Sequence, residues 1–113
     1  MGMFDNVKSK DGHLYQTKRL VCACEWFVEG EAVRDYNGSP ETDQLFEMYD
    51  EKKPYVVALG VIKGGVLVEV LRSPDIPSAY GYEGEALEWM EREVMRLYEK
   101  HELKPWQGHV NLS

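Results

Sequence analysis

The sequence predicts a small α+β domain: an antiparallel β-meander of about five strands with one C-terminal amphipathic helix packed on one face. Three patterns support this fold class. Side chains over residues 16–28 alternate with a period of two, which is typical of a strand. Residues 55–71 are dense in Val, Ile and Leu and are divided by Gly64-Gly65, which indicates a hairpin. Apolar residues recur at spacings of three and four over residues 84–103, which indicates a helix.

A chain of 113 residues is long enough for one hydrophobic core and short for two. We therefore expect a single domain over residues 1–113. Within it we expect a β-rich part at 1–72, a connector at 73–83, the helix at 84–103 and a tail at 104–113.

The first expected hairpin begins with the strand at residues 16–28. Apolar residues occupy both faces of this stretch, which is typical of a strand covered on two sides, so we place it centrally in the sheet. Glu29-Gly30 then predicts a tight turn into a second antiparallel strand over 32–36. Asn37-Gly38-Ser39-Pro40 predicts the loop that closes the hairpin.

Residues 41–53 fit two structures. Ser39 as N-cap and Pro40 at the first helical position favour a short helix. The stretch Leu45-Phe46-Glu47-Met48-Tyr49 also fits a strand. We favour the strand because of the resemblance described below.

The second hairpin turns at Gly64-Gly65, because glycine readily takes both positions of such a turn. A two-residue loop places six residues on one face: Val57, Leu59, Val61, Val66, Val68 and Val70. The other face then carries Ala58 and Gly60, whose small size would admit a closely packed helix.

The predicted helix has one apolar stripe, which we expect to pack on the sheet. The stripe contains Leu87, Met90, Val94, Leu97 and His101. Glutamates gather near the start of the helix and lysines near its end, so the charges complement the helix dipole.

The charge balance argues against two classes of partner. Twenty acidic residues against thirteen basic ones give a formal charge of −7, and such a surface repels phosphate backbones and anionic lipids. We therefore expect no direct binding of nucleic acid and no membrane role. Lys and Arg interrupt the acidic stretches, so we also do not expect mimicry of DNA.

Cysteine use and targeting signals indicate a reducing compartment. Cys22 and Cys24 would lie ~7 Å apart on one face of a strand, a poor geometry for a disulfide, so we expect free thiols buried in the core. The sequence shows no signal peptide, no apolar run near ~20 residues and no lipidation pattern. We expect a cytoplasmic protein.

The chain carries little that indicates catalysis. Cys22 and Cys24 could bind zinc together with histidines such as His101, but structural zinc sites usually space paired cysteines more widely. Signatures of serine hydrolases, phosphate loops and dinucleotide-binding folds are absent from the sequence. We expect no enzyme, no metal and no cofactor. The alternative is a small enzyme or a ligand or metal binder that uses Cys22, Cys24 and His101 between helix and sheet.

The stretch from Ser73 to Tyr82 is a long connector, and long connectors are often functional. It contains Tyr80 and Tyr82 beside Ser and Gly, the residue types of adaptable recognition loops. Trp106 follows the helix. We take Tyr80, Tyr82 and Trp106 as a candidate interaction surface. The alternative is that the two prolines stiffen a crossover while the tyrosines pack over the sheet.

Four stretches of the chain form a recognisable series: Met3-Phe4-Asp5, Tyr15-Gln16-Thr17-Lys18, the strand that ends near Glu29-Gly30, and Asp35-Tyr36-Asn37-Gly38. This series resembles a group of small phage and prophage proteins of unknown function, which typically open with Met-Phe-Asp and carry Phe-Gln-Thr-Lys. The resemblance extends to about residue 71 and implies a strand near residues 45–49 and a later strand pair with a Gly turn. It implies no catalytic residues.

Two features depart from that group. Some of its members have Cys-x-x-Cys near the start, where this chain has Lys8-Ser9-Lys10-Asp11, so we do not expect an N-terminal zinc ribbon. The helix from Gly84 onward is not part of the pattern. The expected function is a non-enzymatic phage or prophage accessory protein that binds a host protein in the bacterial cytoplasm, for counter-defence or host takeover. A structural or self-assembling component is a further alternative, which leaves a homo-oligomer open.

Overall fold

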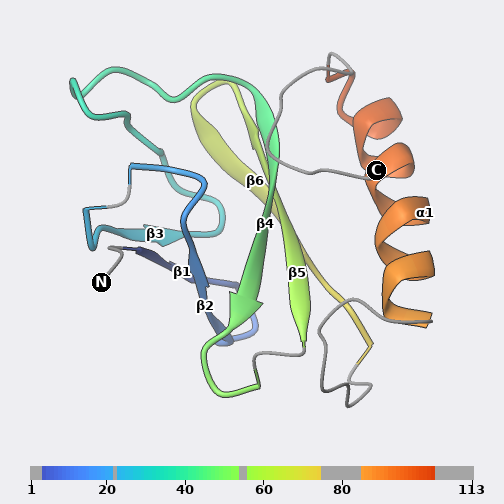
Figure 1. The fold of residues 1–113 in the computed structure, drawn as a ribbon. Coiled ribbons are helices and arrows are strands. Elements are labelled where there is room, and N and C mark those ends of the chain that lie inside the picture. The colour runs from blue at the N-terminus through green and yellow to red at the C-terminus, as the bar shows by residue number, and fades with distance from the viewer. Residues whose placement is uncertain (1–3, 22, 54–55, 75–84, 104–113) are drawn as a thin grey trace.

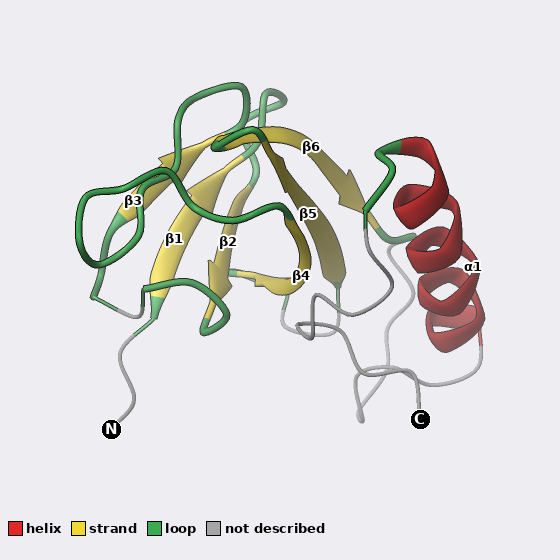
Figure 2. Cartoon of the chain, turned by 90° about the horizontal axis from the view of Figure 1, so that it is seen from above, coloured by secondary structure: helices red, strands yellow, loops and turns green. Residues whose placement is uncertain are grey.

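Six strands form one curled sheet, and one helix lies against its outer face (Figures 1 and 2). The computed structural model describes residues 4–21, 23–53, 56–74 and 85–103. The strands are β1 Asp5–Lys8, β2 Leu14–Thr17, β3 Trp26–Val28, β4 Gln44–Asp50, β5 Val57–Lys63 and β6 Val66–Arg72, and the helix is α1 Glu85–Lys100. Residues 75–83 of the predicted connector and the predicted tail at 104–113 lie outside the described residues.

The strand order is β3-β1-β2-β4-β5-β6. All neighbouring pairs are antiparallel except β1 and β3, which run parallel. The predicted α+β class is confirmed, with one C-terminal helix on a mostly antiparallel sheet. The parallel pair places β3 beside β1 instead of beside β2, so the sheet is not a simple meander.

The segment after β3 joins the two ends of the curled sheet. Gly30 N donates to the carbonyl of Leu67 at 2.7 Å, and Leu67 N donates to the carbonyl of Glu31 at 3.0 Å. Val33 N donates to the carbonyl of Gly65 at 2.8 Å. The tight turn predicted at Glu29-Gly30 exists, but the predicted second strand over 32–36 is wrong, because the chain crosses to β6 instead of folding back on β3.

The single strand predicted over residues 16–28 is also wrong, because side chains capture the backbone amides in its middle. The Thr17 hydroxyl accepts from Arg19 N at 3.1 Å. The buried Asp5 carboxylate accepts from Ala23 N at 3.0 Å and from Glu25 N at 3.1 Å. Between these two amides Cys24 has a φ of +56°, outside the range of a strand.

The strand favoured within residues 41–53 is confirmed as β4, and the hairpin of β5 and β6 is confirmed at Gly64-Gly65. Both glycines have positive φ, as two-residue hairpin turns require. Ile62 pairs with Leu67 but Val61 pairs with Glu69, so Val68 is an extra residue in β6. This bulge reverses the faces beyond it, and the predicted sharing of one face by Leu59 and Val70 is wrong.

The inner face of the curl holds a closed apolar core. Its buried residues are Val7, Tyr15, Phe27, Val33, Phe46, Met48, Ala58, Ile62 and Leu67. Phe46 pairs directly with Gly60, and a Cβ on Gly60 would lie 2.5 Å from Cζ of Phe46. The face of β5 that carries the small residues Ala58 and Gly60 therefore accommodates Phe46. The prediction that these two residues admit the helix is wrong.

The helix packs on the opposite, outer face. Its core comprises Leu45, Val57, Leu59, Val61, Trp89, Met90, Val94, Leu97 and Leu103. Met90, Val94 and Leu97 are buried as the stripe predicts, whereas Leu87 is 39% exposed. Trp89 is buried although it lies beside the stripe, because a large indole can reach the sheet from the edge of the helix face.

The end of the helix is tied to β6 and capped. Oε1 of Glu69 lies 2.8 Å from both Nζ of Lys100 and Nε2 of His101. Glu102 has a φ of +53°, and Leu103 N donates to the carbonyl of Tyr98 at 2.9 Å, which is a common way to end a helix. His101, the last residue of the predicted stripe, thus lies at the edge of this core.

Candidate functional site

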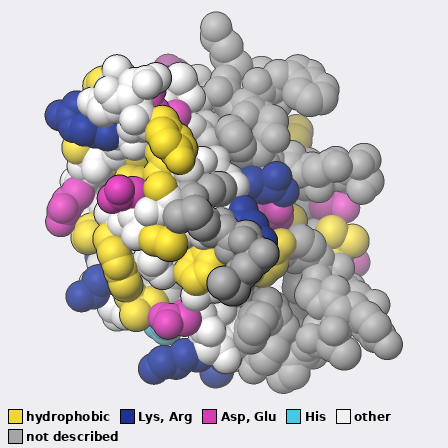
Figure 3. Space-filling model, turned by 60° about the vertical axis from the view of Figure 1, so that its left-hand side comes forward, with side chains coloured by type: hydrophobic (Ala, Val, Ile, Leu, Met, Phe, Trp, Pro, Cys, Tyr) yellow, Lys and Arg dark blue, Asp and Glu magenta, His cyan; other side chains and the backbone are white. Residues whose placement is uncertain are grey.

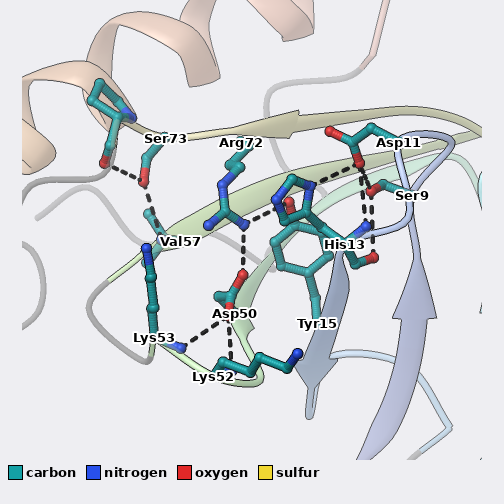
Figure 4. Close-up of polar contacts among 11 residues, drawn as sticks. Ser9, Asp11, His13, Tyr15, Asp50, Lys52, Lys53, Val57, Arg72 and Ser73 are labelled. Carbon is teal, nitrogen blue, oxygen red and sulfur yellow. Dashed lines mark hydrogen bonds and ion pairs between the residues drawn. The ribbon is translucent and has the colours of Figure 1, made fainter.

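Two groups of side chains are candidates for a functional site. The first is a polar cluster at one end of the curled sheet (Figure 4). Nη1 of Arg72 donates to Oδ2 of Asp50 at 2.6 Å and to the hydroxyl of Tyr15 at 3.2 Å. The other Asp50 oxygen accepts from the amides of Lys52 at 2.7 Å and Lys53 at 2.9 Å. The cluster therefore links β2, β4 and β6.

The environment of this cluster shifts the pKa of each of its three ionisable groups. Burial would raise the pKa of Asp50, but hydrogen bonds from Arg72 and from the amides of Lys53 and Lys52 outweigh it and lower that pKa. Burial raises the pKa of Tyr15. Desolvation opposes the charge of Arg72, but its hydrogen bonds to Tyr15 and Asp50 raise its pKa. These hydrogen bonds tie Asp50, Tyr15 and Arg72 together across the sheet.

A turn beside the cluster is organised in the same way. Asp11 accepts hydrogen bonds from the Ser9 hydroxyl and from Nδ1 of His13, the latter at 3.0 Å. The Ser9 bond, followed by the His13 bond, lowers the pKa of Asp11 to about 2. The adjoining cavity measures about 120 Å³ and is lined by Gly12, His13, Leu14, Asp50, Glu51 and Lys52. It is smaller than a typical ligand pocket.

The second candidate is a row of side chains across the outer face of the sheet. Trp26 pairs with Asn6, Asn6 with Gln16, and Gln16 with Tyr49, so these residues form one line across β3, β1, β2 and β4. Trp26 is 58% exposed and Tyr49 is 38% exposed. Two aromatic rings thus flank two side-chain amides. Figure 2 shows β3 at the opposite end of the curl from α1.

A groove of about 380 Å³ adjoins this row. Its lining comprises Phe4, Gln16, Thr17, Lys18, Arg19, Glu47 and Tyr49. Nη2 of Arg19 lies 2.7 Å from Oε1 of the largely buried Glu47. The Thr17 hydroxyl donates to the carbonyl of Glu47 at 2.9 Å, which ties β2 to β4 below the groove. Seen from the side nearest β3, hydrophobic side chains reach the surface between charged ones (Figure 3).

We call the row and the groove together the outer-face site. It consists of Phe4, Asn6, Gln16, Thr17, Lys18, Arg19, Trp26, Glu47 and Tyr49. Aromatic rings, side-chain amides and cations are the groups that recognise other molecules. The described side chains of this site are therefore suited to binding.

No protein-family model, curated protein or solved structure matches this chain. Within the residues that the structure describes, no helix is long and apolar enough to cross a membrane.

The structure describes some of the predicted site residues and not others. Tyr80, Tyr82, Trp106 and Cys22 lie outside the described residues, so the interaction surface predicted from them stays a prediction. Cys24 is exposed, and the prediction that it lies in the core is wrong for the reason given above: its segment is a bend and not a strand.

His101 is engaged by Glu69 at the helix end. Among the described residues no group of three or more His, Cys, Asp and Glu side chains is placed to hold a metal ion.

Sequence reasoning missed the outer-face site. Its residues lie in two separate stretches of the sequence, and the alternation of side chains within each stretch does not show that the two are neighbours in space. Asn6 and Lys8 alternate along β1 and Phe4 comes directly before it, and Gln16 and Lys18 belong to a stretch that carries the phage-protein resemblance. Only the pairing of β1 with β2 brings these residues together.

Proposed function

We propose that this chain is a non-catalytic accessory protein of a phage or prophage, and that it binds a host protein through the outer-face site. The phage origin and the host partner come from the resemblance in the first 71 residues. A protein of this kind acts in the cytoplasm of the bacterial host.

The observation that carries the proposal is that two of the four resembling stretches, at residues 3–5 and 15–18, meet at one groove. Asp5 pairs with Thr17, which places the Met-Phe-Asp stretch beside the Gln-Thr-Lys stretch. The inward residues have structural tasks: Asp5 holds the bend at 23–25, and Thr17 ties β2 to β4. The outward residues Phe4, Gln16 and Lys18 line the groove instead.

The ionisable groups support binding over catalysis. Acid–base catalysts usually have pKa values moved toward neutrality. The pKa values of Asp11, Asp43, Asp50 and Glu69 are lowered, and those of Tyr15, Tyr98, Arg72 and Arg96 are raised. All of these shifts lead away from pH 7.

The test is capture of a partner by a tagged full-length protein expressed in the bacterial host. The double variant Trp26→Ala with Gln16→Ala removes one ring and one amide from the row. Its matched control is Tyr36→Ala, which removes a ring that is 77% exposed and lies outside the site. We expect a stoichiometric partner with the wild type and the control, and its loss with the double variant.

Two results would contradict the proposal. Recovery of no stoichiometric partner would exclude this kind of function. Equal recovery by wild type and double variant would exclude the outer-face site, and a parallel loss in Tyr80→Ala with Tyr82→Ala would then assign the contact to the predicted connector.

A further inference from the structure

The charge of this molecule is unevenly distributed, although its formal total is −7. Residues 4–21 contain four basic and two acidic residues, a net of +2. One of the two acids, Asp5, is fully buried. Residues 85–103 contain six acidic and three basic residues, a net of −3. The total charge therefore does not describe the neighbourhood of the outer-face site.

Three basic side chains lie in or beside this site, and exposed Glu25 and Glu51 lie at its ends, next to Trp26 and beyond Tyr49. Lys8 lies two residues after Asn6 on β1, hence on the same face, and it is exposed. Lys18 and Arg19 line the groove. The one acid in the described lining is Glu47, which is largely buried and forms an ion pair with Arg19. Lys8, Lys18 and Arg19 against Glu47 leave a net charge of +2 around the groove, which matches an anionic ligand.

The row also has a definite length. Trp26 and Tyr49 are separated by three strand spacings, about 14 Å, which is the span of about four residues of an extended peptide. Asn6 and Gln16 lie between them, and a side-chain amide can donate to and accept from a peptide group. A groove of about 380 Å³ at one end is large enough for an apolar side chain.

We infer that the ligand of the outer-face site is a short, extended, acidic segment of a partner protein. This inference rests on the proposed function and names the chemistry of its partner. Carboxylates of the segment lie against Lys8, Lys18 and Arg19, its backbone meets Asn6 and Gln16, and one aromatic or aliphatic side chain enters the groove between Phe4 and Tyr49.

Nucleic acid is the other anionic ligand to consider, and the observations favour peptide. A single strand carries one phosphate on every nucleotide, and a strand longer than the site meets the field of a chain whose total charge is −7. An acidic segment of about four residues ends within the positive area. The experiment includes both ligands.

The test measures binding of three fluorescein-labelled probes to the purified full-length protein by fluorescence anisotropy. The first is the peptide Asp-Glu-Trp-Glu-Asp, the second is its neutral counterpart Asn-Gln-Trp-Gln-Asn, and the third is a short oligothymidylate. We expect the acidic peptide to bind about fivefold more tightly than the neutral one, since two or three exposed ion pairs contribute. We expect its affinity to fall as salt is raised from about 50 mM to about 300 mM.

Charge reversal locates the contact. Lys8→Glu with Lys18→Glu should abolish the preference for the acidic peptide, whereas Lys8→Arg with Lys18→Arg should keep it. Lys52→Glu is the matched control, because Lys52 is exposed and lies at the end of the sheet outside the site. Circular dichroism of each variant checks that the fold is kept. Equal binding of both peptides, tighter binding of the oligothymidylate, or an equal effect of Lys52→Glu would overturn the inference.

The captured partner separates this inference from the proposed function. A partner that is lost with Trp26→Ala and Gln16→Ala, but retained at full level by Lys8→Glu with Lys18→Glu, would overturn the acidic segment and leave the function standing. Absence of any partner that depends on the site would overturn the function itself.

Discussion

The outer face of the sheet has two halves with the same strand alternation and different chemistry. Over β4 and β5 the outward residues Leu45, Val57 and Leu59 are buried beneath α1. Over β3 and β1 the outward residues include Trp26, Asn6 and Lys8, and Trp26 is largely exposed. A sheet face is apolar where the same chain covers it and mixed where it meets solvent or a partner.

This difference separates a half of the face that is covered by the chain's own helix from a half that we propose binds a partner. The helix-covered half contributes to folding stability, because its apolar area is removed from water within the chain. The other half combines rings, amides and cations, which fits recognition. Substitutions should therefore separate the two halves, with large effects on stability in one and large effects on binding in the other.

The largest effect on stability is expected for Leu97→Ala, which removes a fully buried side chain from the helix-covered half. Deletion of a buried leucine side chain should lower the free energy of unfolding by about 3 kcal/mol. Urea denaturation followed by circular dichroism measures it. Met95→Ala on the same helix is the control, because Met95 is 65% exposed and its loss should cost below about 0.5 kcal/mol. Similar losses in both variants would contradict the packing of α1 described above.

Asp50→Asn should lower the free energy of unfolding by about 2 kcal/mol at neutral pH, because it weakens charged hydrogen bonds to Arg72. The folded pKa of Asp50 lies below its ordinary value of 3.8, so its stabilisation is complete above that value and is lost as the pH falls through the folded pKa. Denaturation at several acidic pH values should therefore show the wild type approaching the variant. A constant difference down to the lowest pH would exclude this carboxylate as the cause.

Gly60→Ala should lower the free energy of unfolding by about 1.5 kcal/mol, because the added methyl group overlaps Phe46 in the inner core. A double-mutant cycle with Phe46→Leu tests the cause. The cost of Gly60→Ala should shrink in the Phe46→Leu background, since the smaller side chain leaves room for the methyl group. An unchanged cost would mean that the inner face does not depend on this contact.

The smallest effect on stability is expected in the other half of the outer face. Trp26→Ala should change the free energy of unfolding by less than about 0.5 kcal/mol, because most of the side chain is already exposed. The same change should weaken partner capture in the pull-down described above. A loss of stability as large as that of Leu97→Ala would mean that Trp26 serves the fold and not a partner.

Prediction from sequence succeeded where the pattern is local. The apolar spacing of α1 and the hairpin turn at Gly64-Gly65 both depend on residues that are close together in the sequence. Both predictions are confirmed. It failed at residues 16–28, where Asp5 takes amides from a segment eighteen and twenty residues away. Alternation of apolar and polar side chains cannot show that a distant carboxylate will take the backbone amides that a strand would use.

For the site, the sequence supplied residue types but not their neighbours. Phe4 and Lys18 are distant in the chain and line one groove only after β1 pairs with β2. The surface predicted from Tyr80, Tyr82 and Trp106 lies outside the described residues and awaits the substitutions proposed above.

By itself, then, the sequence determined the α+β class, the β5–β6 hairpin and the amphipathic helix, because each follows from short-range spacing and turn chemistry. Tertiary structure alone decided the parallel pairing of β3 with β1, the contact of Gly30 with Leu67 that joins the ends of the sheet, and the bulge at Val68. These depend on hydrogen bonds between groups far apart in the chain. The line of Trp26, Asn6, Gln16 and Tyr49 follows from the same long-range pairings.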